Sequence, residues 1–243
     1  MHHKALQVPA SLLLLGLALA PLEAHANTGC SCPQVYDPVE CEDGSNYSNI
    51  CEARCEGKGE LVIAGDFGQG NYDCDSLPPG HFFPELECAL QMDEEARFAI
   101  DSDASAYRRD WSGLDHTNPG SGDFLISDGP IFAPTQVWCQ DIEVEPGTWY
   151  EVSAWGLRLS AGSPLPTLQL TIDGQAISDE LDLSTQWSWL GAQWYAPAKG
   201  SSVVELCIEE TTGSGWSGQG NDFGIDDVSM HVLGGQCWPS GEL

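Results

Sequence analysis

Cysteine is the residue type with the clearest chemistry in this chain of 243 residues. All ten cysteines follow residue 29, and five of them lie within residues 30–55. An even number of cysteines in an exported chain predicts a set of disulfides rather than a metal–thiolate site or a catalytic thiol. Cys139 and Cys207 lie on the polar sides of two expected strands, so they can pair only if those strands are neighbours.

Carboxylates are the second chemically active group. The chain has 37 Asp and Glu against 8 Lys and Arg, which gives a net charge of −29 at pH 7. This charge repels nucleic acids and anionic membranes, so we exclude both as partners. Two explanations of the charge remain, namely solubility in a salty medium and calcium binding, because Ca²⁺ prefers oxygen ligands.

No arrangement of histidines, serines or carboxylates forms a known catalytic pattern. The sequence contains neither a Gly-x-Ser-x-Gly elbow nor a His-Glu-x-x-His helix. His116 lies between Asp115 and Thr117, a setting typical of a histidine that fixes a loop by hydrogen bonds. We therefore expect a protein that is not an enzyme.

The first 26 residues have the three parts of an export signal. Lys4 is the positive start, residues 11–22 are the apolar run, and Ala24-His25-Ala26 is the small-x-small cleavage pattern. The apolar run is too short to span a bilayer comfortably, and no later segment approaches that length. We expect a secreted protein without membrane insertion, located extracellularly, in a periplasm or at a cell surface.

The remaining sequence divides into two modules. Residues 30–55 carry five cysteines and no tryptophan, whereas all nine tryptophans occur from Trp111 onward. A Gly-rich stretch at residues 56–59 marks the change in composition. We predict a small module at residues 27–60, a larger one at 65–233 and a C-terminal tail at 234–243.

Disulfides must stabilise the small module, because residues 30–55 are too few to bury a useful apolar core. Residues 50–55 have the pattern of a short helix, with Asn49 placed as its N-cap and Glu52 three residues later. The two cysteines of this helix are four residues apart and share one helical face.

Residues 30–60 resemble a short-form Kazal domain, a family of serine protease inhibitors. The resemblance is carried by the order and spacing of Cys30, Cys32-Pro33-Gln34-Val35-Tyr36, Pro38-Val39, Asp43-Gly44, Tyr47-Ser48-Asn49 and Cys51-Glu52-Ala53-Arg54-Cys55. It implies the disulfides Cys30–Cys55 and Cys32–Cys51. It also implies an inhibitory loop fixed in a substrate-like shape, so that little entropy is lost on docking.

The inhibitory loop implied by the resemblance consists of Cys32, Pro33, Gln34, Val35 and Tyr36, braced by Asn49. Gln34 takes the primary specificity position. Because its side chain is neutral, it favours a subtilisin-like protease over a trypsin-like one, whose buried carboxylate would stay unpaired.

The sequence departs from the Kazal pattern at two places. Cys41 lies one residue later than in the family, and no sixth cysteine occurs at the usual distance after Cys55. We assign the remaining cysteines to the pairs Cys41–Cys74, Cys139–Cys207 and Cys88–Cys237.

The second module has the pattern of many short strands separated by turns. Apolar residues alternate in 138–144 and 168–172, and these stretches end at Pro146-Gly147 and Asp173-Gly174. The pattern predicts a mainly β fold, an antiparallel β-sandwich. Near the end of the module the alternation changes register at Asp226-Asp227, which predicts a β-bulge or a strand covered on both faces.

Residues 65–233 resemble the galactose-binding-like jelly rolls, a class that includes carbohydrate-binding modules and MAM domains. The resemblance is carried by Gly65-Asp66-Phe67, Asp115-His116-Thr117, Gly120, Gly122, Val137-Trp138, Gln140 and Asn221-Asp222-Phe223-Gly224-Ile225-Asp226-Asp227-Val228. It implies a structural calcium with Asp66 and Asp226 as ligands; alternatively, these carboxylates cap turns.

Trp216 and Trp111 are the candidate glycan-binding residues. Trp216 lies in a Gly/Ser-rich stretch where little core is available, and Trp111 follows three charged residues. An exposed indole can stack on a sugar ring. We therefore expect a secreted Kazal-like inhibitor tethered to a jelly roll that binds a glycan or another surface polymer. The alternative is an adhesion or matrix protein without inhibitory activity.

Overall fold

The computed structural model describes the second module almost completely and the first in part. The described residues are 36, 38–41, 44–49, 52–53, 59–68, 72, 74–89, 91–215, 220–233 and 237–239. The predicted signal, the cysteines at positions 30, 32, 51 and 55, loop residues 32–35 and Trp216 lie outside them. Within the described ranges, no helix has the length and apolar character needed to cross a membrane.

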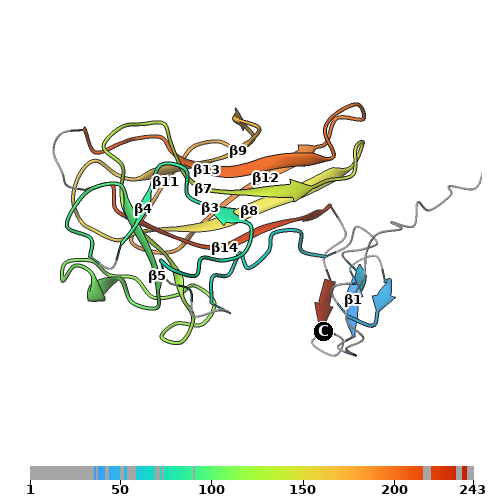
Figure 1. Cartoon of the computed structure of the whole chain (residues 1–243), viewed down its shortest axis with the longest axis horizontal. Coiled ribbons are helices and arrows are strands. Elements are labelled where there is room, and N and C mark those ends of the chain that lie inside the picture. The colour runs from blue at the N-terminus through green and yellow to red at the C-terminus, as the bar shows by residue number, and fades with distance from the viewer. Residues whose placement is uncertain are drawn as a thin grey trace, which may run out of the picture.

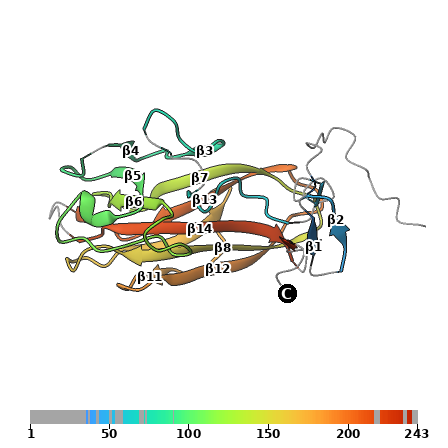
Figure 2. The ribbon, with the colours of Figure 1, turned by 90° about the horizontal axis from the view of Figure 1, so that it is seen from below.

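The second module is the β-sandwich that the alternation predicted, with two six-stranded sheets (Figures 1 and 2). The first sheet contains β3 (His81–Phe82), β7 (Thr135–Glu143), β9 (Thr167–Ile172), β10 (Gln175–Ala176), β11 (Leu181–Asp182) and β13 (Val203–Glu210). The second contains β4 (Glu87–Cys88), β5 (Arg97–Asp101), β6 (Phe124–Asp128), β8 (Trp149–Arg158), β12 (Ser188–Tyr195) and β14 (Phe223–Val232). All described strand pairs are antiparallel except β4–β5.

The main core lies between the two sheets, where alternate side chains of each strand meet. Leu168, Leu170 and Ile172 of β9 point inward, as their spacing predicted, and pack in the same cluster as Val152 and Met230 of the second sheet. This alternation leaves the odd-numbered residues of β8 on the outer face of the second sheet.

A second, smaller core covers only part of that outer face. The segment between β5 and β6, which includes the 3₁₀ helix η1 (Ala104–Ala106), packs over the second sheet. Its cluster consists of Met92, Ala99, Ala104, Trp111, Phe124, Ile126, Leu157 and Leu159. This cluster contacts β8 through Leu157, near the end of the strand, and through Leu159 just after it. The first half of β8, before Trp155, and the part of β12 that pairs with it are therefore not covered by this segment.

The predicted bulge at Asp226-Asp227 is present in β14. The register between β14 and β8 shifts between Asp226 and Ser229, and Asp227 has a φ of 47°. Gly65 passes this point so closely that a Cβ there would lie 1.9 Å from the Val228 carbonyl oxygen. The bulge therefore needs glycine at position 65, which explains part of the Gly65-Asp66-Phe67 motif.

The small module contains a three-stranded sheet of β1 (Val39–Cys41), β2 (Asn46–Tyr47) and β15 (Cys237–Pro239). β15 comes from the C-terminal end of the chain and pairs with β1 (Figure 1). The prediction of a separate tail at 234–243 was therefore wrong.

Asn49 caps the helical residues Glu52 and Ala53, since its Oδ1 accepts a hydrogen bond from the Glu52 N–H at 3.0 Å, as predicted.

The disulfides of the described residues are Cys41–Cys237, Cys74–Cys88 and Cys139–Cys207. The pairing of Cys139 with Cys207 is the one we predicted, and these residues face each other on β7 and β13. The pairs Cys41–Cys74 and Cys88–Cys237 were wrong. β15 brings Cys237 opposite Cys41, a neighbour that local spacing does not reveal.

Candidate ligand-binding face and acidic pocket

The outer face of the second sheet carries two aromatic cross-strand pairs on β8 and β12. In the ladder of β12 and β8, Trp189 faces Trp155 at one end and Tyr195 faces Trp149 at the other. The positions between them are the pairs Gly191–Ser153 and Gln193–Glu151. Figure 2 shows β12, β8 and β14 side by side along the sandwich. This face thus has aromatic ends and a small, polar middle.

Trp189 is half exposed, at 52% of its surface, although it is paired within the β12–β8 ladder. Its indole lies against the backbone of Gly191, because a Cβ at position 191 would come within 2.1 Å of the Trp189 ring. The glycine thus provides the space in which the ring rests against the sheet. An exposed indole held in this way offers a planar apolar surface to a ligand.

β14 adds a row of polar groups beside β8. Ser229 and His231 lie opposite Ser153 and Glu151, and the His231 Nε2 is 3.9 Å from the Glu151 Oε1. Glu60 borders this row and accepts hydrogen bonds from the Ser229 hydroxyl and from the Met230 N–H at 2.7 Å. Burial raises the pKa of the Glu60 carboxyl. The row supplies hydrogen-bonding groups on the β14 side of the polar middle.

His116 forms a wall at the Trp155 end of the face. Its ring stacks on Trp155 at 4.0 Å between centroids, and the ring of Trp187 meets it edge-on at 5.6 Å. The His116 Nδ1 is 2.6 Å from the Asp227 Oδ2, and its backbone N–H donates to the Asp226 Oδ2 at 2.9 Å. The histidine therefore fixes a loop, the role that its sequence context indicated.

An acidic pocket of about 260 Å³ opens beside this wall. Its lining residues are Asp66, Gly68, Asp115, Thr117, Asn118, Ser121, Gly122 and Asp227. Asp115 reaches the pocket because residue 122 is glycine, where a Cβ would come within 2.3 Å of the Asp115 carboxylate. Three carboxylates and several neutral oxygen atoms thus face one cavity.

Asp226 lies next to the pocket and is fully buried. Burial, together with the charges of Asp227 and Asp115, raises the pKa of its carboxyl to about 8, against the opposing effect of hydrogen bonds from the His116 and Asp227 N–H groups. The charged groups that act on it are carboxylates. A bound cation would offset this repulsion.

The pocket fits the predicted calcium in ligand type, with one change of residue. Asp66 lines it as expected, but Asp226 lies behind it, and Asp227 and Asp115 provide the other carboxylates. Among the described residues, the three metal-ligating side chains whose donor atoms all lie within 4.8 Å of one another are Cys139, Glu205 and Cys207, and two of these form a disulfide. The three pocket carboxylates are farther apart than this. A cation in the pocket would therefore need neutral oxygen atoms or water as additional ligands.

Trp111 is not the exposed platform that the sequence predicted. It is 2% exposed, packs in the smaller core, and donates its indole N–H to the Asp222 Oδ2 at 3.2 Å. Arg108 lies 5.2 Å from its ring centroid. Of the charged neighbours in sequence, Arg108 thus contacts the buried ring, whereas Arg109 and Asp110 are exposed. Trp216, the other candidate, lies outside the described residues.

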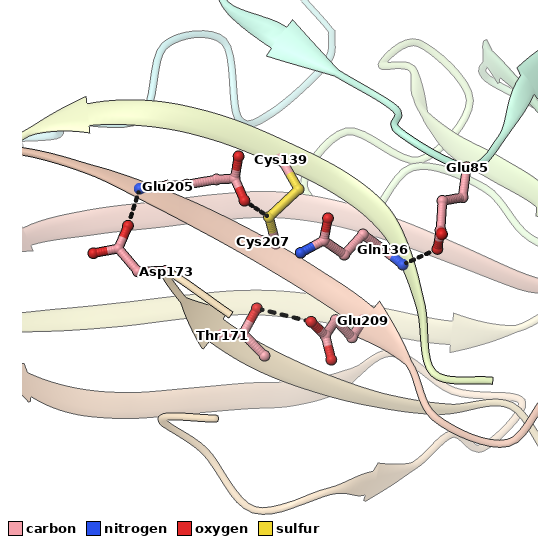
Figure 3. Close-up of a disulfide and its surroundings, with 8 residues drawn as sticks. All are labelled: Glu85, Gln136, Cys139, Thr171, Asp173, Glu205, Cys207 and Glu209. Carbon is pink, nitrogen blue, oxygen red and sulfur yellow. Dashed lines mark hydrogen bonds between the residues drawn. A yellow bond between two sulfur atoms is a disulfide. The ribbon is translucent and has the colours of Figure 1, made fainter. Parts of the chain in front are cut away.

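The outer face of the first sheet differs from that of the second. Figure 3 shows the Cys139–Cys207 disulfide there, surrounded by Thr171 and by acidic residues. The Glu205 Oε1 is 3.6 Å from the Cys207 sulfur, the Thr171 hydroxyl donates to Glu209 at 3.4 Å, and the Gln136 N–H donates to Glu85 at 2.9 Å. Acidic side chains thus surround the disulfide in this part of the first sheet.

Sequence reasoning missed Trp189, Trp149 and Tyr195. The exposed rings of β12 and β8 alternate with the buried residues Leu190 and Tyr150. This period of two was the available signal, because an aromatic residue on the outward side of a strand is exposed unless another segment covers it.

His81 has a structural role. Its ring is buried and accepts a hydrogen bond from the Trp138 indole N–H at 3.1 Å.

Comparison with known proteins gives limited matches. No protein-family model matches the chain. A 38-residue stretch is 45% identical to insoluble matrix shell protein 4 of Ruditapes philippinarum, which covers 16% of this chain and 12% of that protein. The chain thus spans about an eighth of the length of the curated relative that it matches.

Solved structures resemble the sandwich at low sequence identity. The CBM22-1 xylan-binding domain of Paenibacillus barcinonensis Xyn10C aligns with a TM-score of 0.49 and 13% identity, over 72% of this chain and 96% of that domain. A cyclase from Fischerella sp. aligns with a TM-score of 0.49 and 11% identity, over 74% and 97%. The sugar-binding C-terminal domain of EclA aligns with a TM-score of 0.35 and 23% identity, over 40% and 67%.

Proposed function

We propose that this protein is a secreted, non-catalytic binding protein whose sandwich binds a polysaccharide on the outer face of β8 and β12. The observation that carries the proposal is the half-exposed indole of Trp189, which rests over Gly191 beside Trp155. Sugar rings have apolar C–H faces that stack on such rings, while the hydroxyl groups at their edges need polar partners. Gln193, Glu151 and Ser153 supply these partners next to the ring.

Retention on immobilised polysaccharides tests the proposal. Trp189→Ala should weaken binding by at least about tenfold, since it removes the apolar contact area of one ring. Trp189→Phe should retain much of the affinity, because it keeps an aromatic face. Phe132→Ala is the matched control, since Phe132 is 64% exposed and lies in the loop after β6. Lack of binding by the wild type to a broad polysaccharide panel would refute the function.

The acidic pocket is proposed to hold a structural calcium ion among Asp66, Asp115 and Asp227, with at least one of these carboxylates bound through a water molecule. The pocket combines carboxylates with the oxygen atoms of Thr117 and Asn118, a hard-ligand set that suits Ca²⁺. His116 and Thr117 both contact Asp227 at 2.6 Å. A cation there would stabilise the wall beside Trp155.

Inhibition of a serine protease by the small module is a second proposal. It is favoured by the disulfide between Cys41 and Cys237, which supplies from the C-terminal strand the sixth cysteine that the Kazal resemblance requires. Tyr36, the last residue of the proposed loop, is 82% exposed. An assay of residual activity with subtilisin and trypsin tests it, and unchanged activity of both enzymes at micromolar protein would refute it.

A secreted location is proposed on three grounds. Residues 1–26 have the pattern of an export signal, and the described residues contain three disulfides, which persist in oxidising compartments. The partial relative is a shell matrix protein by name. Edman sequencing of protein from culture medium should give an N-terminus at Asn27.

A further inference from the structure

The outer face of β8 and β12 has an aromatic platform at each end. Trp155 and Trp189 form the first pair, and Trp149 and Tyr195 form the second, with ring centroids of the latter 5.2 Å apart. Trp149 is 51% exposed and Tyr195 is 42% exposed. Four aromatic residues thus occupy the two ends of one ladder.

The separation of the two platforms follows from the strands. Tyr195 is six positions after Trp189 along β12, and Trp155 is six positions after Trp149 along β8. At about 3.3 Å per residue, the backbone positions of the two platforms lie about 20 Å apart, and the Trp189 ring, which leans over Gly191, brings the rings closer than that. A single sugar ring is much shorter than this distance, whereas a chain of several linked rings spans it.

The surface between the platforms has the character expected below such a chain. Gly191 and Ser153 are small, and Gln193 and Glu151 present an amide and a carboxylate. Ser153, Gln193 and Glu151 offer hydrogen-bond partners to hydroxyl groups beside the Trp189 ring, which occupies the space above Gly191. On these two strands, the outward positions from Trp149 to Trp155 and from Trp189 to Tyr195 include no lysine or arginine.

We propose that the face binds the interior of an extended, neutral polysaccharide chain, which lies along β8 and β12 and contacts both aromatic platforms at once. This inference rests on the proposed function and adds the class of ligand and the second contact. Glu151 and the net charge of −29 disfavour polymers of uronic acids or sulfated sugars. Two linked contacts give a ligand that reaches both platforms a higher affinity than either contact alone.

Titration with neutral oligosaccharides of increasing length tests the inference. The probes are cello-, xylo- and chito-oligosaccharides from the disaccharide to the hexasaccharide, measured by calorimetry with the full secreted chain. Wild-type affinity for the best series should rise at least about tenfold from disaccharide to hexasaccharide. The double variant Trp149→Ala/Tyr195→Ala should lose this gain and keep the disaccharide affinity, with unchanged circular dichroism as the check on folding.

The possible outcomes separate the two proposals. Binding that depends on Trp189 but has the same affinity for short and long ligands would overturn the extended-chain inference and leave the proposed function intact. A length-dependent gain that survives the double substitution would also overturn it. Failure of every neutral oligosaccharide and polysaccharide to bind the wild type would refute the function itself, and tighter binding of polygalacturonate than of neutral polymers would overturn the ligand class.

Discussion

The buried carboxyl of Asp128 should make this protein more stable in mild acid than at pH 8. Asp128 is fully buried at the end of β6, where its Oδ2 accepts a hydrogen bond from Arg108 and its Oδ1 has no hydrogen-bond partner among the described residues. Burial, together with Asp222 and Glu95, raises the pKa of Asp128 to about 8, against the opposing charge of Arg108. One guanidinium therefore faces three carboxyl groups.

The sign of the pH effect follows from this raised pKa. Below the unfolded-state pKa of about 4 both states are protonated, so Asp128 costs no stability. Above it the unfolded state loses the proton first, and stability falls by up to about 1.4 kcal/mol per pH unit until the folded-state pKa is reached. The ceiling at pH 8 is about 6 kcal/mol, and relaxation of the cluster on ionisation reduces this to about 2–4 kcal/mol.

Asp128→Asn imitates the protonated residue. Its amide oxygen can accept from Arg108, and its NH₂ group can donate toward Asp222. Thermal unfolding should show nearly equal Tm values for variant and wild type near pH 4. At pH 8 the variant should unfold roughly 5–15 °C higher, since about 1 kcal/mol moves the Tm of a domain of this size by about 2–4 °C.

Asp141→Asn is the control for this experiment, because Asp141 is an exposed carboxylate on β7. It should leave the pH dependence of the Tm unchanged. If Asp128→Asn lowers the Tm equally at pH 4 and pH 8, the carboxylate is ionised and stabilising through Arg108, and the reasoning from burial is wrong.

Three further predictions concern the core, the pocket and the disulfides. Trp111→Ala should lower the free energy of unfolding by about 3–5 kcal/mol in urea titrations, because it empties a buried site, whereas Trp189→Ala should change it by less than about 1 kcal/mol. Calcium should raise the Tm of chelator-treated protein by mass action, and Asp227→Asn should abolish this rise; an unchanged wild-type melt would exclude the metal. Peptide mapping without reduction should yield Cys41 joined to Cys237, and a peptide joining Cys41 to Cys74 would contradict the pairing of β1 with β15.

Local patterns in the sequence determined the strands and several of their details. The alternation of Leu168, Leu170 and Ile172 predicted an inward face, and the change of register at Asp226-Asp227 predicted the bulge. Asn49 and Glu52 predicted a capped helix start. These features depend on residues within a few positions of each other, so their physical causes are present in the local sequence.

The site depended on contacts between distant segments, which only the tertiary structure decided. Trp111 is buried because Asp222, far along the chain, accepts its N–H, and Trp189 is exposed because the segment after β5 covers only the other half of the sheet. Cys237 pairs with Cys41 because the C-terminal strand returns to β1. A residue type and its near neighbours give the capacity for burial, stacking or pairing. Which of these occurs depends on the segment that packs against it, and that segment lies 111 residues away for Trp111 and 196 for Cys41.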